Sequence, residues 1–351
     1  MSYIGKPKVS HPNMPRNELG LTVRDYEGGV STLCAGCGHD SITAAIIQAV
    51  FELGIEPHKL AKMSGIGCSS KTPAYFVSQS HGFNSVHGRM ASVTTGANAA
   101  NKDLTYIGVS GDGDSLSIGM GQFAHVIRRN LNMCYMIENN GVYGLTKGQY
   151  SASADVGSVA KKAMPNRQMP IDPVSTAIGL GATYIARSFS GDKQQLVPLI
   201  KGALTHKGFA LLDVISPCVT FNDNEGSTKS YAHTRKHFHH VIDADFIPPT
   251  EEIRAAYDEG EAMPVKLHDG SKIIFRKLDK SYDPTSRAAA FSFLRDSINK
   301  GEIITGLLYI DESTGDMHSD AGTVEMPLSQ LGYEDLNPGQ DQLNELMNRY
   351  R

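Results

Sequence analysis

The 351-residue sequence lacks several features that mark other classes of protein. No apolar stretch approaches the eighteen or more residues that a membrane-spanning helix needs, so we expect no membrane partner. Residues 1–18 contain no apolar core like that of a secretory signal, which predicts a cytoplasmic protein. No long basic run occurs and the formal net charge is −4, which argues against nucleic acid as a partner.

Internal repeats and low-complexity tracts are also missing, and apolar segments instead alternate in a way that predicts a doubly wound α/β fold. The clearest unit is a strand over 104–110, a helix over 115–129 and a strand over 132–138. This order is typical of a right-handed βαβ crossover with parallel strands. The other expected elements are helices over 41–53, 92–101 and 192–205 and strands over 59–66 and 209–215.

The two ends of the chain differ from this alternating region. Residues 1–30 contain several prolines and little periodicity, which predicts an N-terminal arm. Beyond residue 226 the chain carries more charge and alternates less, so we expect a C-terminal extension over 227–351. The α/β domain is therefore expected over 31–226.

Polar residues follow two of the predicted strands, in Gly111-Asp112-Gly113-Asp114 and in Asn139-Asn140. Glycines let the backbone turn sharply and approach a charged group. Carboxylate and amide oxygens are ligands that Mg²⁺ prefers, usually together with phosphate oxygens. The N-terminus of the helix that Asp114 opens favours an anion. A Gly-Asp-Gly turn alone occurs by chance, but the pair of motifs predicts a magnesium–diphosphate site.

Four of the five cysteines form a second group of candidate ligands. Cys34 and Cys37 form a CxxC motif, and Cys68 and Cys218 each follow a predicted strand at the edge that carries the diphosphate motif. Thiolates suit either an iron–sulfur cluster or zinc, and the spacing does not choose between them. Cys134 lies inside an apolar strand and is expected to be a buried core thiol.

The sequence resembles the β subunit of 2-oxoacid:ferredoxin oxidoreductases over roughly residues 30–230. The matching blocks are LCAGCGH (33–39), SGIGCSS (64–70), HGRMASVTTGAN (87–98), GDGD (111–114), ENNGVYGLTKGQ (138–149) and SPCVTFN (216–222). The resemblance implies a thiamine diphosphate-binding fold and one [4Fe–4S] cluster, held by Cys34, Cys37, Cys68 and Cys218. Leu33 and Ala35 depart from the family, which often shows Trp and Pro there, but neither position supplies a ligand.

The resemblance also implies which residues contact the cofactor. The magnesium ligands would be Asp112, Asn140 and the carbonyl of Val142. The residues expected around thiamine diphosphate are Ile66, Gly67, Cys68, Ser69, His87, Gly88, Gly111, Asp112, Gly113, Asp114, Asn140, Val142, Gly144, Leu145 and Thr146.

Three residues are candidates for catalysis and for substrate binding. His87 is expected beside the cofactor. Lys147 lies in a TKGQ run that resembles relatives acting on larger or acidic 2-oxoacids, where pyruvate enzymes often carry glycine, and Lys71 is a second candidate for a substrate carboxylate. Residues 221–231 also resemble 2-oxoglutarate-type subunits. We therefore expect 2-oxoglutarate as the substrate, with pyruvate or a broad range of 2-oxoacids as the alternative.

The implied activity is oxidative decarboxylation of 2-oxoglutarate to succinyl-CoA and CO₂, with coenzyme A as co-substrate, or reductive carboxylation in reverse. Ferredoxin accepts electrons singly, so a redox-active cluster suits the reaction and zinc does not. No motif resembles the family's pyrimidine-binding domain, and no ferredoxin-type cysteine run occurs. We therefore expect one cluster and a partner α subunit in an (αβ)₂ assembly. The alternatives are a non-redox thiamine diphosphate lyase or synthase and a non-catalytic α/β protein stapled by zinc.

Overall fold

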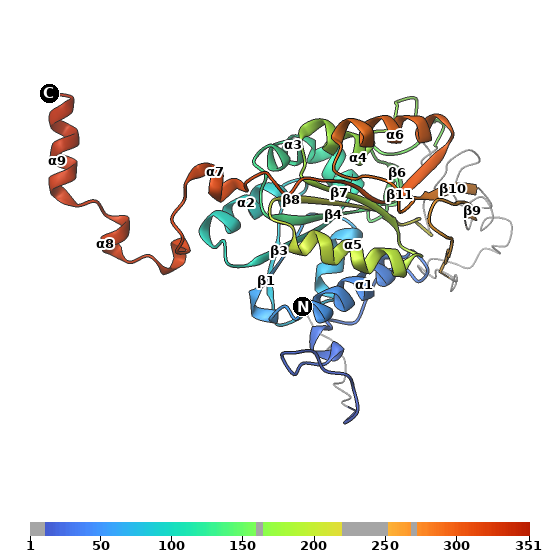
Figure 1. The fold of residues 1–351 in the computed structure, drawn as a ribbon, viewed down its shortest axis with the longest axis horizontal. Helices are drawn as coiled ribbons and strands as arrows, with labels where there is room; N and C mark the ends of the chain where they lie inside the picture. The colour runs from blue at the N-terminus through green and yellow to red at the C-terminus, as the bar shows by residue number, and fades with distance from the viewer. Residues whose placement is uncertain (1–10, 159–163, 220–251, 268–271) are drawn as a thin grey trace.

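A nine-stranded sheet of order β2-β1-β3-β4-β8-β7-β11-β10-β9 organises the computed structural model, which describes residues 11–158, 164–219, 252–267 and 272–351 (Figure 1). Its strands are β1 (Leu60–Ser64), β2 (His81–Asn84), β3 (Thr105–Gly111), β4 (Met133–Asn139), β7 (Tyr184–Phe189), β8 (Phe209–Ile215), β9 (Ala262–Lys266), β10 (Lys272–Lys277) and β11 (Glu302–Ile310). Pairing is parallel from β2 to β7 and between β10 and β11, and antiparallel where β11 meets β7 and β10 meets β9. The predicted α/β fold with a mostly parallel sheet is confirmed.

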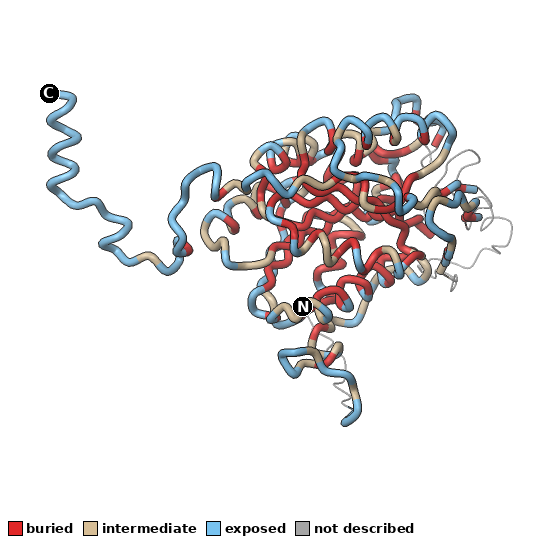
Figure 2. The backbone as a smooth tube through the Cα atoms, in the orientation of Figure 1, coloured by how far each residue is buried: buried red, intermediate tan, exposed pale blue. Residues whose placement is uncertain are grey.

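Helices cover both faces of this sheet, as a doubly wound fold requires. α1 (His39–Glu52) and α5 (Lys193–Thr205) share one face, and α2 (Met90–Ala100), α3 (Met120–Arg128), α4 (Pro173–Leu180) and α6 (Arg287–Asn299) share the other (Figure 1). Ile42 and Ile46 of α1 pack in one core with Leu196 and Ile200 of α5, following the helical repeat of three to four residues. The central strands are buried between these layers (Figure 2).

The central βαβ unit is confirmed, but its helix begins differently from the prediction. A π-helical turn, Gly113–Ile118, precedes α3, which starts only at Met120. Gly119 separates the two, and a Cβ atom there would stand 2.5 Å from the carbonyl oxygen of Asp114. The segment that follows β3 is therefore a wide π-helical turn, which carries polar side chains, and not the start of a regular α-helix.

The predicted terminal segments are more closely joined to the sheet than the sequence pattern indicates. Near the N-terminus, Tyr26 of the short helix η1 (Val23–Tyr26) is buried edge-on against Phe51 of α1, at 5.9 Å between ring centres. Within the predicted C-terminal extension, β9, β10 and β11 continue the sheet. The expected boundary between residues 226 and 227 lies outside the described residues.

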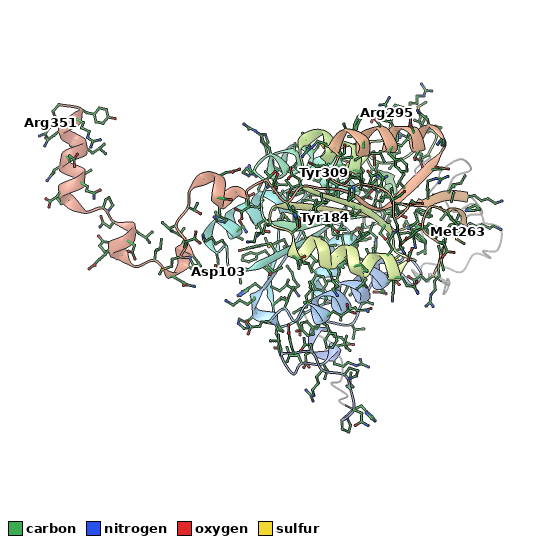
Figure 3. All side chains as sticks on the ribbon, in the orientation of Figure 1. Asp103, Tyr184, Met263, Arg295, Tyr309 and Arg351 are labelled. Atoms are coloured by element: carbon green, nitrogen blue, oxygen red, sulfur yellow. The ribbon has the colours of Figure 1, made fainter. Side chains whose placement is uncertain are left out.

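The last part of the chain is a largely exposed arm, defined here as residues 322–351, which contacts the body through Glu325 and the buried Pro327 before α8 and α9 lead away from it (Figures 1 and 2). It follows α7 (Met317–Ala321) and contains η6 (Leu328–Gln330), α8 (Tyr333–Leu336) and α9 (Gly339–Arg349). Arg351 at its end lies far from the sheet (Figure 3). Within the described ranges, no helix combines the length and apolarity that crossing a membrane requires.

The remaining short elements lie near the carboxyl ends of β1 and β4 or lead into β1. η2 (Pro57–Lys59) precedes β1, and η3 (Ser69–Ala74) follows it. β5 (Val142–Tyr143) and β6 (Gln149–Tyr150) form a separate antiparallel hairpin just after β4. η3 and this hairpin frame the candidate site described next.

Candidate functional site

A cavity of about 60 Å³ lies at the carboxyl ends of β1, β3 and β4. This is the edge at which ligands of open α/β sheets bind. The residues that line it are Ile66, Gly67, Cys68, Ser69, His87, Gly111, Gly113, Asp114, Asn140, Val142, Tyr143, Gly144, Leu145 and Thr146. Every residue predicted around thiamine diphosphate is among them except Gly88 and Asp112, and Tyr143 is an addition. The structure thus brings together four sequence blocks that are far apart in the chain.

The predicted magnesium ligands lie side by side and are buried. Asp112 is 1% exposed, and its Oδ1 accepts a hydrogen bond of 3.3 Å from the backbone N–H of Asn140. The Oδ1 of Asn140 accepts one of 3.1 Å from the N–H of Val142. Two hydroxyls that the sequence analysis missed, those of Ser151 and Ser153, donate to Asp112 Oδ2. No local pattern marks these serines, because they reach Asp112 only through the β5–β6 hairpin.

Asp114 has a different environment and connects its own segment to the loops that carry Ile66 and His87. Its carboxylate accepts hydrogen bonds from the N–H of Gly88 at 2.7 Å and of Ile66 at 3.2 Å, and it contacts His87 Nδ1. A Cβ atom on Gly65 would stand 1.8 Å from Asp114 Oδ2, so this close approach requires glycine. Asp114 therefore lines the cavity while holding the loops that carry Ile66 and His87.

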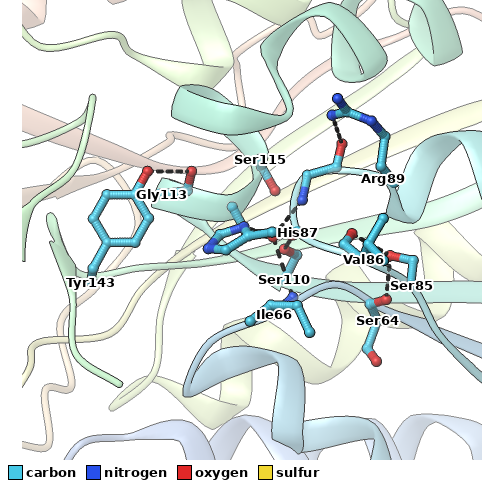
Figure 4. Close-up of polar contacts among 12 residues, drawn as sticks. Ser64, Ile66, Ser85, Val86, His87, Arg89, Ser110, Gly113, Ser115 and Tyr143 are labelled. Atoms are coloured by element: carbon cyan, nitrogen blue, oxygen red, sulfur yellow. Dashed lines mark hydrogen bonds and ion pairs between the residues drawn. The ribbon is translucent and has the colours of Figure 1, made fainter. Parts of the chain in front are cut away.

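The His87 ring is held from two sides. Asp114 contacts its Nδ1, and the Tyr143 ring packs edge-on at 6.0 Å between ring centres (Figure 4). The Tyr143 hydroxyl in turn donates to the carbonyl of Gly113 at 3.0 Å. Because Nδ1 faces a carboxylate, Nε2 is the ring nitrogen left to exchange protons with a bound molecule.

Two of the four candidate cluster cysteines, Cys68 and Cys218, lie beside this cavity. A Cβ atom on Gly144 would stand 3.3 Å from Cys68 Sγ and 3.9 Å from Cys218 Sγ, so the missing side chain leaves room between these two thiols. Burial raises the pKa of Cys37, and the thiols of Cys218 and Cys34 raise it further. Burial likewise raises the pKa of Cys68, with Cys34 adding to the effect. The thiols of Cys34 and Cys218 thus lie near enough to Cys37, and that of Cys34 near enough to Cys68, to interact electrostatically, and thiolates are the ligands of iron–sulfur clusters.

Two further observations concern metal ligands and the fifth cysteine. Across residues 11–158, 164–219, 252–267 and 272–351, no three His, Cys, Asp or Glu side chains form a group able to hold a single metal ion. Cys134 is 1% exposed inside β4, where burial raises its pKa to about 12. It is the buried core thiol that the sequence predicts.

Substituting Gly144 by alanine tests whether the space between Cys68 and Cys218 is needed. We expect the variant to retain less than half of the iron of the unsubstituted protein, because the new methyl group would crowd the Cys68 sulfur and fill the space beside Cys218. The matched control is Gly121→Ala in α3, where nothing lies within 4 Å of the added Cβ and alanine favours the helix by about 1 kcal/mol. Iron and acid-labile sulfide are measured per chain, and equal iron in the two variants would contradict the expectation.

A buried chain of polar contacts leads from the predicted magnesium ligands to α4. Ser153 Oγ donates to Asn139 Oδ1 at 3.0 Å, and Asn139 Nδ2 donates to Asp213 Oδ1 at 3.0 Å. Asp213 Oδ2 then accepts from Arg187 Nε at 2.7 Å, and Arg187 also contacts Asp172, the residue that caps α4. Burial lowers the pKa of Arg187, but the two carboxylates outweigh it and raise the pKa above its usual range.

The two candidate substrate lysines lie outside the lining of the cavity. Lys147 is exposed in the turn between β5 and β6 and has φ +75°, a left-handed conformation that favours glycine. Lys71 is half-buried on η3, where its charge partly opposes the rise that burial causes in the pKa of the Cys68 thiol. The segment 221–231, which also favours 2-oxoglutarate, lies outside the described residues.

Comparison with known proteins identifies relatives of this arrangement. Residues 65–214 match the family described as thiamine pyrophosphate enzyme, C-terminal TPP binding domain. The 2-oxoacid:ferredoxin oxidoreductase subunit beta of Saccharolobus solfataricus is 43% identical over 199 residues, which are 56% of this chain and 65% of that subunit. The 2-oxoglutarate synthase subunit KorB of Methanocaldococcus jannaschii is 37% identical over 189 residues, which are 54% of this chain and 69% of that subunit.

A solved structure extends the similarity over nearly the whole chain. The 2-oxoglutarate:ferredoxin oxidoreductase from Magnetococcus marinus, with 2-oxoglutarate, coenzyme A and succinyl-CoA bound, aligns with a TM-score of 0.72 and 30% identity. The alignment covers 95% of this chain and 97% of that one. By sequence, in contrast, the match spans slightly less than two thirds of the Saccharolobus subunit and 51% of the 2-oxoglutarate oxidoreductase subunit KorB of Mycobacterium tuberculosis.

Proposed function

Because this chain belongs to the β subunits of the 2-oxoacid:ferredoxin oxidoreductase family, we propose that it binds thiamine diphosphate, Mg²⁺ and one [4Fe–4S] cluster and oxidises a 2-oxoacid. The observation that carries this proposal is the segment 140–146, which serves both parts of the site. At one end Asn140 and Val142 lie beside Asp112, and at the other Gly144 packs against the thiols of Cys68 and Cys218. A metal–diphosphate and a redox cluster would therefore be direct neighbours.

The chain's own residues have distinct roles in this proposal. Asp112, Asn140 and the carbonyl of Val142 would hold Mg²⁺, and the glycines at 111 and 113 leave room for the diphosphate. His87, oriented by Asp114, would hold or move a proton at its Nε2. When bound, thiamine diphosphate supplies the electron sink for loss of CO₂ and the cluster supplies a one-electron acceptor.

We further propose that the substrate is 2-oxoglutarate, which both the Methanocaldococcus and the Magnetococcus names contain, and that coenzyme A and ferredoxin are the other reactants, as the name of the Magnetococcus complex indicates. The residues that line the cavity are those around the proposed magnesium ligands, so the cavity would take the diphosphate end of the cofactor. The rest would be bound by an α subunit, in a cytoplasmic (αβ)₂ assembly. The arm over 1–30, the cofactor domain over 31–226 and the extension over 227–351 remain our proposed division of the chain.

The function is tested on the chain co-produced with its α partner and purified without oxygen. We expect about four iron and four sulfide ions per chain, together with viologen reduction that depends on both 2-oxoglutarate and coenzyme A. Pyruvate and branched 2-oxoacids serve as comparison substrates. Stoichiometric zinc without sulfide would favour the zinc-stapled protein, and turnover without viologen reduction would favour the non-redox thiamine enzyme.

Lys147→Gly tests the preference for 2-oxoglutarate. Loss of one carboxylate contact worth about 1.4 kcal/mol is expected to raise KM for 2-oxoglutarate roughly tenfold, while KM for pyruvate stays nearly unchanged. Because Lys147 already adopts a left-handed conformation, glycine fits the backbone there and misfolding is not expected. The matched variant Lys147→Arg keeps the charge and should keep the preference. Equal changes for both substrates would refute this role of Lys147.

A further inference from the structure

Two buried serines contact the predicted magnesium ligand Asp112 and have no place in the function proposed above. Ser151 and Ser153 follow the β5–β6 hairpin and are 4% and 3% exposed. Both hydroxyls donate to Asp112 Oδ2, that of Ser153 at 2.6 Å, and the two hydroxyl oxygens lie 3.3 Å apart. One oxygen of the carboxylate is therefore held by two hydrogen bonds from one short segment.

The protons of the two hydroxyls are directed to this carboxylate. A distance of 2.6 Å is typical of a hydrogen bond from a hydroxyl to a charged oxygen, which is stronger than one to a neutral oxygen. Ser153 Oγ also lies 3.0 Å from Asn139 Oδ1, but a hydroxyl carries only one proton. The charged Asp112 oxygen is the preferred acceptor, so each serine supplies one donor to Oδ2.

The other oxygen of Asp112 is bonded less completely. An ionised carboxylate can accept about two hydrogen bonds at each oxygen. Within the described ranges, Oδ1 accepts only the backbone N–H of Asn140, at 3.3 Å, which is longer than the usual N–H···O distance of about 2.9–3.0 Å. Oδ1, the oxygen that faces Asn140, therefore keeps the capacity to bind a further partner, and Asn140 lines the cavity.

Backbone contacts hold the segment that carries these serines in place. The N–H of Ser151 donates to the carbonyl of Gly141 at 3.0 Å, and the N–H of Ala152 donates to Ser117 Oγ of the π turn at 3.0 Å. The carbonyl of Ala152 accepts from the N–H of Ile171 at 2.8 Å. The protein alone therefore fixes both hydroxyls, as a preorganised binding site requires.

We propose that Ser151 and Ser153 act as positioning residues, which hold Asp112 by its Oδ2 and leave Oδ1 to bind Mg²⁺. This inference rests on the proposed function, because it requires the ion at Asp112. Without such contacts, rotation about the Cβ–Cγ bond of an aspartate is broad, with two roughly equivalent orientations. Neither serine lines the cavity, so both act on the ion through Asp112. Removing supporting contacts of this kind typically weakens metal binding about 10–100-fold.

The test is a titration of Mn²⁺ into the metal-free αβ protein at a fixed concentration of thiamine diphosphate, in which EPR measures the free ion. Ser151→Ala and Ser153→Ala are each expected to weaken Mn²⁺ binding about tenfold, and the double variant about a hundredfold. At saturating Mn²⁺, kcat should stay within about twofold of the unsubstituted value, because the serines hold a metal ligand and do not touch the reacting molecules.

The matched control is Ser158→Ala, the same change at a buried serine whose hydroxyl has no hydrogen-bond partner in the described part of the chain. Its Mn²⁺ affinity should equal that of the unsubstituted protein. Unchanged affinity in the double variant would overturn the inference, as would a loss of kcat that saturating Mn²⁺ does not restore. If the double variant fails to fold, the single variants decide, and unchanged affinity in both is equally contrary. Failure of the unsubstituted protein to bind Mn²⁺ would instead refute the proposed magnesium site itself.

Discussion

Asp112→Ala is expected to lower kcat/KM for the 2-oxoacid by about a thousandfold, the equivalent of roughly 4 kcal/mol. Asp112 is the only carboxylate among the proposed magnesium ligands, and it is 1% exposed. Removing it takes away the main negative charge that holds the ion, and with the ion the anchor of the diphosphate. Affinity for thiamine diphosphate should fall together with activity, which calorimetric titration in excess Mg²⁺ would measure.

The control for this substitution is Asp103→Ala, the same change at an exposed aspartate that precedes β3 at its opposite end (Figure 3). It should leave both activity and cofactor affinity within twofold of the unsubstituted protein. Full activity in Asp112→Ala would show that Asp112 is not a ligand of the magnesium ion. Loss of activity with unchanged cofactor affinity would show that Asp112 acts in another way.

Asp213→Leu is expected to lower the free energy of unfolding by about 3–5 kcal/mol, the usual effect of breaking a buried ion pair by removing one partner. Asp213 is fully buried and accepts from both Arg187 and Asn139. The substitution leaves the buried guanidinium with Asp172 alone and removes the acceptor of the Asn139 Nδ2 hydrogen bond. Denaturant unfolding of the full chain, with the slope checked for constancy, gives the change.

An exposed ion pair provides the comparison for Asp213. Glu345 and Arg349 of α9 are in contact at 2.6 Å, yet their side chains are 66% and 68% exposed. Glu345→Leu should therefore change the free energy of unfolding by less than about 1 kcal/mol. Similar losses in the two variants would mean that the Asp213 contacts contribute no more than a surface pair.

The sequence predicts the centre of this fold because the relevant signals there are local. The strands that end at Gly111 and Asn139 are continuous apolar runs joined by one helix, so their parallel pairing follows from connection rules. The same logic places Asp112 and Asn140 at one edge of the sheet. It also predicts that Cys68 and Cys218 lie at this edge, because each of them comes shortly after a strand.

Contacts between distant parts of the chain were beyond the reach of such patterns. β11 joins β7 antiparallel across more than a hundred residues, and nothing near Glu302–Ile310 indicates that partner. Ser153 meets Asp112, and Glu138 meets His39, only because three-dimensional packing brings them together. The π turn after β3 depends on the close packing around Gly119, which no periodicity reveals.

The arm over 322–351 has a consequence for how the protein withstands proteases. Exposed segments with few contacts to the body are the usual sites of cleavage. However, the sequence contains no lysine or arginine between Lys300 and Arg349. Trypsin therefore has no cleavage site in the arm before Arg349, although the backbone there is accessible. Enzymes that cut beside acidic or apolar residues, in contrast, find exposed sites in the arm at Glu334 and Leu336.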